Sequence, residues 1–284
     1  MKILGFSVDR SILDEPCAFD DVAAPYFSVP AGDAGCSAAH GVGCLVLHGI
    51  GGTPANVRVV AETLAGRGYA VFVPTLPGHG RTVRALTAST GEQWLACARD
   101  GYERLRAAGC DRIVPVGLSL GGILAGLLAA ERDCAALVLI SAPVRMRAYL
   151  HVARLLAPFV PAVRYPAEDG EKLRQKAPYG QMYAGFSPAK LSDLYRLIRR
   201  LRRSLPHITC PTLALWARYD DKVAPGAAAA LRRGLVHAPL TSRVMEHSPH
   251  GSTYDPRERD LVAALCAAFI DDIAGGNAPT AGGI

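Results

Sequence analysis

The most informative segment of the sequence is Gly117-Leu118-Ser119-Leu120-Gly121-Gly122. It follows the apolar run Arg112 to Val116, which predicts a buried strand, and it leads into Gly122 to Ala130, which predicts a helix. A serine on a tight turn between a strand and a helix is held in a strained backbone conformation, and flanking glycines let the chain pass close by. The pattern favours a turn that presents the Ser119 hydroxyl at a helix N-terminus. The alternative is an ordinary glycine-rich turn between a strand and a helix, which has a similar sequence.

Strand-like and helix-like runs alternate along most of the chain. Further strands are predicted at Gly43 to Leu47, Tyr69 to Val73, Ala136 to Ile140, Thr212 to Trp216 and Arg243 to Met245, with an edge strand at Tyr26 to Val29. Further helices are predicted at Pro54 to Ala65, Glu92 to Ala108 and Arg257 to Ile273. Such alternation is typical of a parallel sheet with crossover helices. A chain of 284 residues, half of them hydrophobic, fits one α/β domain with an insertion better than two domains.

One region, between Ser141 and the strand at Thr212, breaks this alternation and is too long for a simple crossover. It contains two helical patterns, Met146 to Leu156 and Pro188 to Arg203. Ser187 is the expected N-cap of the second helix, with a proline at the first helical position. The pattern predicts a small helical lid inserted over the sheet.

The expected domain organisation follows from this insertion. Residues 1–141 and 207–274 should form the core, and residues 142–206 the lid. Residues 275–284 have the composition of turns and are expected to be disordered.

The predicted lid carries the excess positive charge of the chain. Residues 142–206 hold thirteen Lys or Arg against four Asp or Glu, a net of +9, whereas the whole chain has a net charge of +6. In the second lid helix, arginines flank an apolar face of leucines and one isoleucine. Two interpretations are open: the apolar face covers a pocket and the arginines are solvated, or the lid makes weak contact with anionic lipid surfaces or acidic substrates. We expect no nucleic-acid partner.

A serine hydroxyl is a weak nucleophile and needs a base, which in turn needs an acid to orient it. On this kind of fold the expected chain order is serine, acid, histidine. Asp220 and Asp221 follow the strand at Thr212, where sheets of this class build their sites. His247 and His250 follow the last strand and are two candidate bases.

Acyl transfer also requires two backbone N–H groups that stabilise the oxyanion of the tetrahedral intermediate. The residue after the nucleophile, Leu120, should supply one. The loop His48-Gly49-Ile50-Gly51-Gly52 follows an early strand, and its glycines allow an inward-pointing amide. We assign the second N–H to Ile50.

No cofactor or metal is expected. The eight cysteines never form a C-x-x-C pair, and no glycine run has the form of a phosphate-binding or dinucleotide-binding loop. The first residues contain too short an apolar stretch for a signal peptide, so the expected location is cytoplasmic.

Together with Pro77-Gly78-His79-Gly80 and Arg218-Tyr219-Asp220-Asp221, these motifs resemble the bacterial carboxylesterases and monoacylglycerol lipases of the α/β-hydrolase fold. The resemblance extends from about Cys44 to Ile273. It implies a catalytic triad of Ser119, Asp220 and His250, rather than Asp221 or His247, and a small lid over an acyl-binding pocket. Ile50 stands where this group often has an aromatic residue.

The implied function is hydrolysis of a small carboxylic ester, with short to medium acyl chains or a monoacylglycerol, through an acyl-enzyme intermediate. A thioesterase or an amide hydrolase would use the same residues. A ligand-binding protein that has lost turnover is the alternative from another class, and the intact set of Ser119, Asp220 and His250 argues against it.

Overall fold

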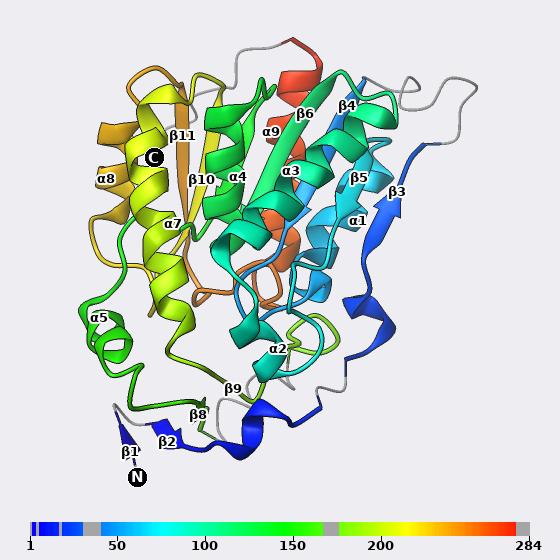
Figure 1. The fold of residues 1–284 in the computed structure, drawn as a ribbon. Coiled ribbons are helices and arrows are strands. Elements are labelled where there is room, and N and C mark those ends of the chain that lie inside the picture. Colours follow the sequence, from blue (N-terminus) through cyan, green and yellow to red (C-terminus); the bar gives the residue numbers. More distant parts are fainter. Residues whose placement is uncertain (1, 4–5, 17–18, 31–40, 167–175, 277–284) are drawn as a thin grey trace.

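The computed structural model describes residues 2–3, 6–16, 19–30, 41–166 and 176–276 (Figure 1). A seven-stranded sheet runs through its centre in the order β11-β10-β7-β6-β4-β5-β3. The strands are β3 (Tyr26–Ser28), β4 (Val42–Leu47), β5 (Ala70–Val73), β6 (Arg112–Leu118), β7 (Leu137–Ile140), β10 (Thr212–Ala217) and β11 (Leu240–Met245). Every neighbouring pair is parallel except β3 and β5. The predicted strands are all present, and β3 is the edge strand expected near Tyr26.

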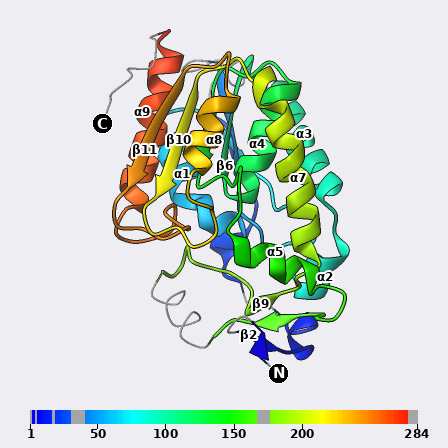
Figure 2. The ribbon, with the colours of Figure 1, turned by 90° about the vertical axis from the view of Figure 1, so that its left-hand side faces the viewer.

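The central strands are buried on both faces, as their continuous apolar sequences predict. Every residue of β4 and of β7 is buried. Helices α3, α4 and α7 cover one face of the sheet, and α1 and α9 cover the other (Figure 2). The core therefore consists of two apolar layers, one on each side of the sheet.

Four helices of the core begin and end close to their predicted limits: α1 (Arg58–Gly66), α3 (Gly91–Ala107), α4 (Leu120–Glu131) and α9 (Arg259–Ala274). Two more are α2 (Val83–Ala88) and α8 (Ala227–Gly234). The helix predicted from Pro54 starts instead as a 3-10 turn, Pro54–Val57, before α1. Thr90 and Gln93 form a capping box that fixes the start of α3. The short helices α2 and α8 were not predicted.

A second, smaller sheet lies beyond the carboxyl ends of the parallel strands (Figure 1). Its strands are β1 (Lys2–Ile3), β2 (Phe6–Val8), β8 (Val163–Arg164) and β9 (Gly185–Phe186), all antiparallel. The first two come from the N-terminal segment and the last two from the inserted region. Residues 1–141 were predicted to belong to the core, but β2, in the N-terminal segment, pairs with β8 of the inserted region.

The inserted region also contains α5 (Ala148–Leu155) and α7 (Lys190–Ser204). The expected N-cap of α7 is wrong: the cap residue is Ala189, without a side-chain hydrogen bond. The Lys190 N–H instead bonds the Ser187 carbonyl at 3.1 Å, so a tight turn precedes the helix and Ser187 is buried before it.

The apolar face of α7 is divided between the core and a pocket. Leu197 packs on Gly91 and Leu201 on Gly126, both in the helical layer of the core. Leu191 and Leu194, in the first turns, line a cavity together with Ser119. The predicted cover over the pocket therefore involves only the N-terminal end of α7.

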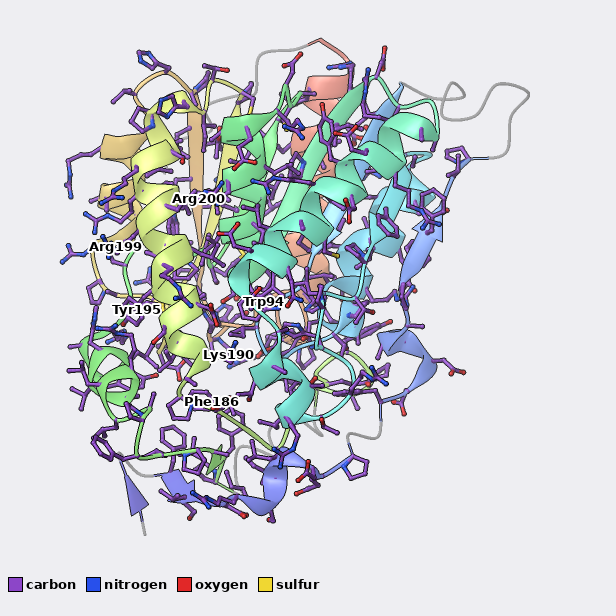
Figure 3. All side chains as sticks on the ribbon, viewed as in Figure 1. Trp94, Phe186, Lys190, Tyr195, Arg199 and Arg200 are labelled. Atoms are coloured by element: carbon purple, nitrogen blue, oxygen red, sulfur yellow. The ribbon has the colours of Figure 1, made fainter. Side chains whose placement is uncertain are left out.

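The arginines of α7 lie farther along the helix. Arg196, Arg199, Arg202 and Arg203 are exposed. Arg199 and Arg200 lie on the upper part of α7, whereas Lys190 and Phe186 lie nearer its lower end (Figure 3). Contact between these arginines and anionic lipid surfaces stays a prediction.

Within the described residues, every helix is too short or too polar to span a bilayer. Five of the cysteines there, Cys44, Cys97, Cys134, Cys210 and Cys266, are free. Cys110 forms a disulfide, which the scattered cysteines did not predict. The predicted disordered tail lies outside the described residues from position 277 onward.

Candidate active site

Ser119 occupies a strained turn between β6 and α4. Its φ of 54° and ψ of −112° are uncommon for a residue with a side chain. The glycines around it are required by close approach: a Cβ on Gly121 would lie 2.0 Å from the Leu47 carbonyl oxygen, and one on Gly117 would lie 2.2 Å from the backbone of Gly121. The turn thus places Ser119 at the start of α4, as predicted.

Two hydrogen bonds join the three predicted residues. His250 Nε2 lies 2.8 Å from Ser119 Oγ, and His250 Nδ1 lies 2.8 Å from Asp220 Oδ2. An ionised carboxylate only accepts, so Nδ1 carries the proton and donates to Asp220. Nε2 is then free to accept the proton of the Ser119 hydroxyl.

Asp220, not Asp221, faces the histidine. Asp220 is 8% exposed, and its Oδ1 accepts the N–H groups of Lys222 and Val223, each at 2.8 Å. Burial raises the pKa of the Asp220 carboxyl, but His250 and these backbone donors outweigh it and hold the pKa below its usual value. Asp221 is exposed and pairs with Lys222. His247 is exposed as well. The structure therefore brings together Ser119, Asp220 and His250, the three residues that the family resemblance implies.

A buried carboxylate that the sequence analysis missed holds the loop of His250. Glu258 is 4% exposed and accepts hydrogen bonds from the Ser248 hydroxyl and from the N–H groups of Glu246, His247 and Ser248. Burial raises the pKa of the Glu258 carboxyl, and these donors lower it further than burial raises it. The charged group therefore fixes the chain between β11 and His250. A glutamate before a helix is common, so no sequence signal separates this one from a surface residue.

We expect Glu258→Gln to destabilise the fold by about 1.5–3 kcal/mol, because an amide cannot replace a carboxylate that accepts several hydrogen bonds. The folded-state pKa is lowered, so the contribution of Glu258 is complete above the ordinary glutamate pKa of about 4.3 and is lost as the pH falls through the folded-state value. Thermal unfolding across pH should show the largest difference from wild type near neutrality. Asp260→Asn, at a carboxylate that is 81% exposed, is the control. A difference that does not shrink in acid would contradict the role of the charge.

The loop after β4 lies beside the serine and is held by a buried histidine. A Cβ on Gly49 would lie 3.5 Å from the Ser119 Cβ. His48 Nδ1 donates to the Gly49 carbonyl at 2.9 Å, and His48 Nε2 accepts the Leu76 N–H at 3.1 Å. Burial lowers the pKa of His48 to about 4, so the ring is neutral and can both donate and accept. These bonds set the path of the loop that carries Ile50.

The two predicted oxyanion donors are placed near the serine. Leu120 is the first residue of α4, and the N–H of a first helical residue has no intrahelical partner. Ile50 lines the same cavity as Ser119. His79, from the Pro77-Gly78-His79-Gly80 motif, is buried with its ring centre 5.0 Å from that of His48, and burial lowers the pKa of His79 to about 3. It contacts neither Ser119 nor Asp220 in the described hydrogen bonds.

Ser119 and His250 line an apolar cavity. Its walls come from α5, from the start of α7 and from the small sheet, with Leu150, Ala153, Leu156, Val163, Phe186 and Leu194 among the lining residues. Across the described part of the chain, no group of three or more His, Cys, Asp or Glu side chains is arranged to hold a metal ion. The arrangement joins a serine, a base and an acid to a pocket suited to a hydrocarbon chain.

Comparison with known proteins places the chain in a family. The model of the alpha/beta hydrolase family matches residues 44–265. The chain is 32% identical over 215 residues to the thermostable monoacylglycerol lipase of Bacillus sp. (strain H-257), covering 75% of this chain and 84% of that protein. It is 29% identical over 229 residues to a carboxylesterase of Bacillus subtilis (strain 168), covering 78% and 89%.

A solved structure agrees with these relatives. It belongs to a study of two metagenome-derived lipolytic enzymes, and it matches with a TM-score of 0.77 and 26% identity over 90% of this chain and 100% of that one. The chain therefore belongs to the alpha/beta hydrolase family and groups with its carboxylesterases and monoacylglycerol lipases.

Proposed function

We propose that this hydrolase cleaves carboxylic esters with short to medium acyl chains, monoacylglycerols included, through an acyl-enzyme intermediate on Ser119. The hydrogen-bonded series from Ser119 through His250 to Asp220, beneath an apolar cavity, carries this proposal. The named activities of the two Bacillus relatives support it.

In the first half-reaction, the Ser119 oxygen attacks the ester carbonyl while His250 Nε2 takes the hydroxyl proton. The negative oxygen of the tetrahedral intermediate is stabilised by the N–H groups of Ile50 and Leu120 and by the N-terminal end of α4. The intermediate collapses, and His250 gives its proton to the departing alcohol. In the second half, water attacks the acyl-serine with His250 again as base, and the carboxylic acid leaves.

Asp220 acts through His250 and does not contact the substrate. Its carboxylate holds the ring with the proton on Nδ1 and stabilises the positive charge that develops on the imidazole. The lowered pKa of Asp220 keeps it ionised at neutral pH.

The apolar cavity predicts a dependence on acyl chain length. Each methylene that becomes buried contributes about 0.8 kcal/mol, so kcat/KM should rise about fourfold per methylene until the cavity is full. Ala153→Trp should shift the optimum to shorter chains, because the indole would occupy space along α5. Val152→Trp is the control, because Val152 is the neighbouring residue on α5 and is 47% exposed. The same optimum in both variants would mean that the acyl chain does not bind along α5.

Ester, thioester and amide substrates with one acyl group separate the related activities. We expect kcat/KM to be highest for the ester when the three are compared with the wild-type enzyme and with Ser119→Ala. A higher value for the thioester would assign the chain to the thioesterases. If Ser119→Ala loses every activity that the wild type has, Ser119 is the nucleophile whichever substrate is preferred.

A further inference from the structure

Two ammonium groups lie in the lining of the cavity, and no aspartate or glutamate among the described residues does. Lys190 is occupied within the protein. Its Nζ donates to the Ser89 carbonyl and, at 2.7 Å, to Asp193, and it lies 5.6 Å from the centre of the Trp94 ring. Its side chain is only 7% exposed. Lys190 therefore serves the packing of α7.

Lys222 is placed differently. Its Nζ lies 2.6 Å from Asp221 Oδ2 and 3.5 Å from the hydroxyl of Tyr149, which lines the same cavity. Its side chain lines the cavity and is 41% exposed, so Lys222 lies between the cavity and solvent. Its backbone N–H bonds Asp220, which fixes Lys222 beside the acid of the site whatever its side chain does.

The pair with Asp221 does not preclude another anion. The Asp221 side chain is 60% exposed, and exposed ion pairs contribute only about 0.2–1 kcal/mol. An ammonium has three donors. Asp221 and the Tyr149 hydroxyl accept two of them, which leaves one for an anion in the cavity.

We propose that Lys222 binds an anionic group of the substrate, a carboxylate or a phosphate, at a distance from the ester bond. This rests on the proposed esterase function and names a substrate class for it. The carbon chain occupies the apolar walls, and the anion accepts a charge-assisted hydrogen bond from Lys222 Nζ. Lysine suits either anion, because its ammonium acts as a point charge without the fixed fork of arginine.

Two pairs of substrates test this proposal and distinguish the sources of the anion. The first pair is the para-nitrophenyl half-ester of adipic acid and its methyl ester, which differ by one carboxylate on the acyl side. The second pair is a monoacylglycerol phosphate and the monoacylglycerol with the same acyl chain, which differ by a phosphate on the alcohol side. For each pair, the readout is the ratio of kcat/KM for the anionic member to that for the neutral member.

Lys222→Met should lower this ratio by up to about fivefold in at least one pair, the size expected for losing one ion pair with a partly exposed ammonium. Asp221→Asn should raise the ratio in the same pair, because it removes the competing carboxylate. Arg199→Gln also removes one positive charge, but on the exposed side of α7, and should leave the ratio as in wild type. Lys222→Arg should keep most of the ratio, which covers the case in which Lys222→Met folds poorly.

Equal ratios in wild type, Lys222→Met and Asp221→Asn would overturn the proposal. A fall of the same size in Arg199→Gln would overturn it too, because only the total charge would then matter. Failure of the wild type to hydrolyse the neutral members would instead contradict the esterase function itself. The pair that responds shows whether the anion lies on the acyl or the alcohol side.

Discussion

Ser119→Ala is expected to lower kcat for ester hydrolysis by about 10⁴- to 10⁶-fold. The reason is that, in the described part of the chain, the group hydrogen-bonded to His250 Nε2 is the Ser119 hydroxyl, which donates to it at 2.8 Å. The remaining rate would come from substrate binding and the oxyanion donors alone. Initial rates with a para-nitrophenyl ester measure this loss.

Folding should be unaffected, because the hydrogen bond described for the Ser119 hydroxyl goes to His250 and not to a group of the apolar core. Ser141→Ala is a matched control. Ser141 is also a buried serine at the end of a strand with a positive φ, 47°, but it is not hydrogen-bonded to His250. A similar loss in Ser141→Ala would show that the region is sensitive to any change, and substantial activity in Ser119→Ala would rule out Ser119 as the nucleophile.

Asp220→Asn should lower kcat by about 10⁴-fold, and Asp221→Asn should have far less effect on a neutral ester. Asparagine keeps the size of Asp220 but can neither hold the proton on His250 Nδ1 nor stabilise the imidazolium that forms during the reaction. Asp221 is exposed, and among the described residues its carboxylate is hydrogen-bonded to Lys222 and not to His250. Steady-state rates for both variants, with unfolding midpoints to verify folding, test the assignment.

The reverse order, with Asp221→Asn as the more damaging change, would mean that the acid has been assigned wrongly. Equal and small effects would mean that His250 works without either carboxylate.

The core strands could be predicted from the sequence because a strand buried on both faces must be continuously apolar, as β4 and β7 are. The turn at Ser119 was predictable because a Cβ at Gly117 or Gly121 cannot fit. By contrast, β8 and β9 have two residues each, which is too short for any period to be visible.

The site was only partly predictable. Both Asp220 and Asp221 follow β10, and the local pattern does not show which one turns toward His250. Their difference arises from the tight turn in which Lys222 and Val223 donate to Asp220. The role of Glu258 depends on its burial, and the role proposed for Lys222 depends on its place beside Tyr149 in the cavity lining; a single sequence displays neither.

The central claim is that Ser119 is the nucleophile, and a fluorophosphonate probe tests it most directly. Such probes phosphonylate an activated serine, so the purified protein should take up one probe per chain, and peptide mass spectrometry should place it on Ser119. Ser119→Ala should take up none, and His250→Ala should react far more slowly because the hydroxyl would lack its base. A probe attached to another residue, or ester hydrolysis that persists after Ser119 is fully labelled, would rule out Ser119 as the nucleophile.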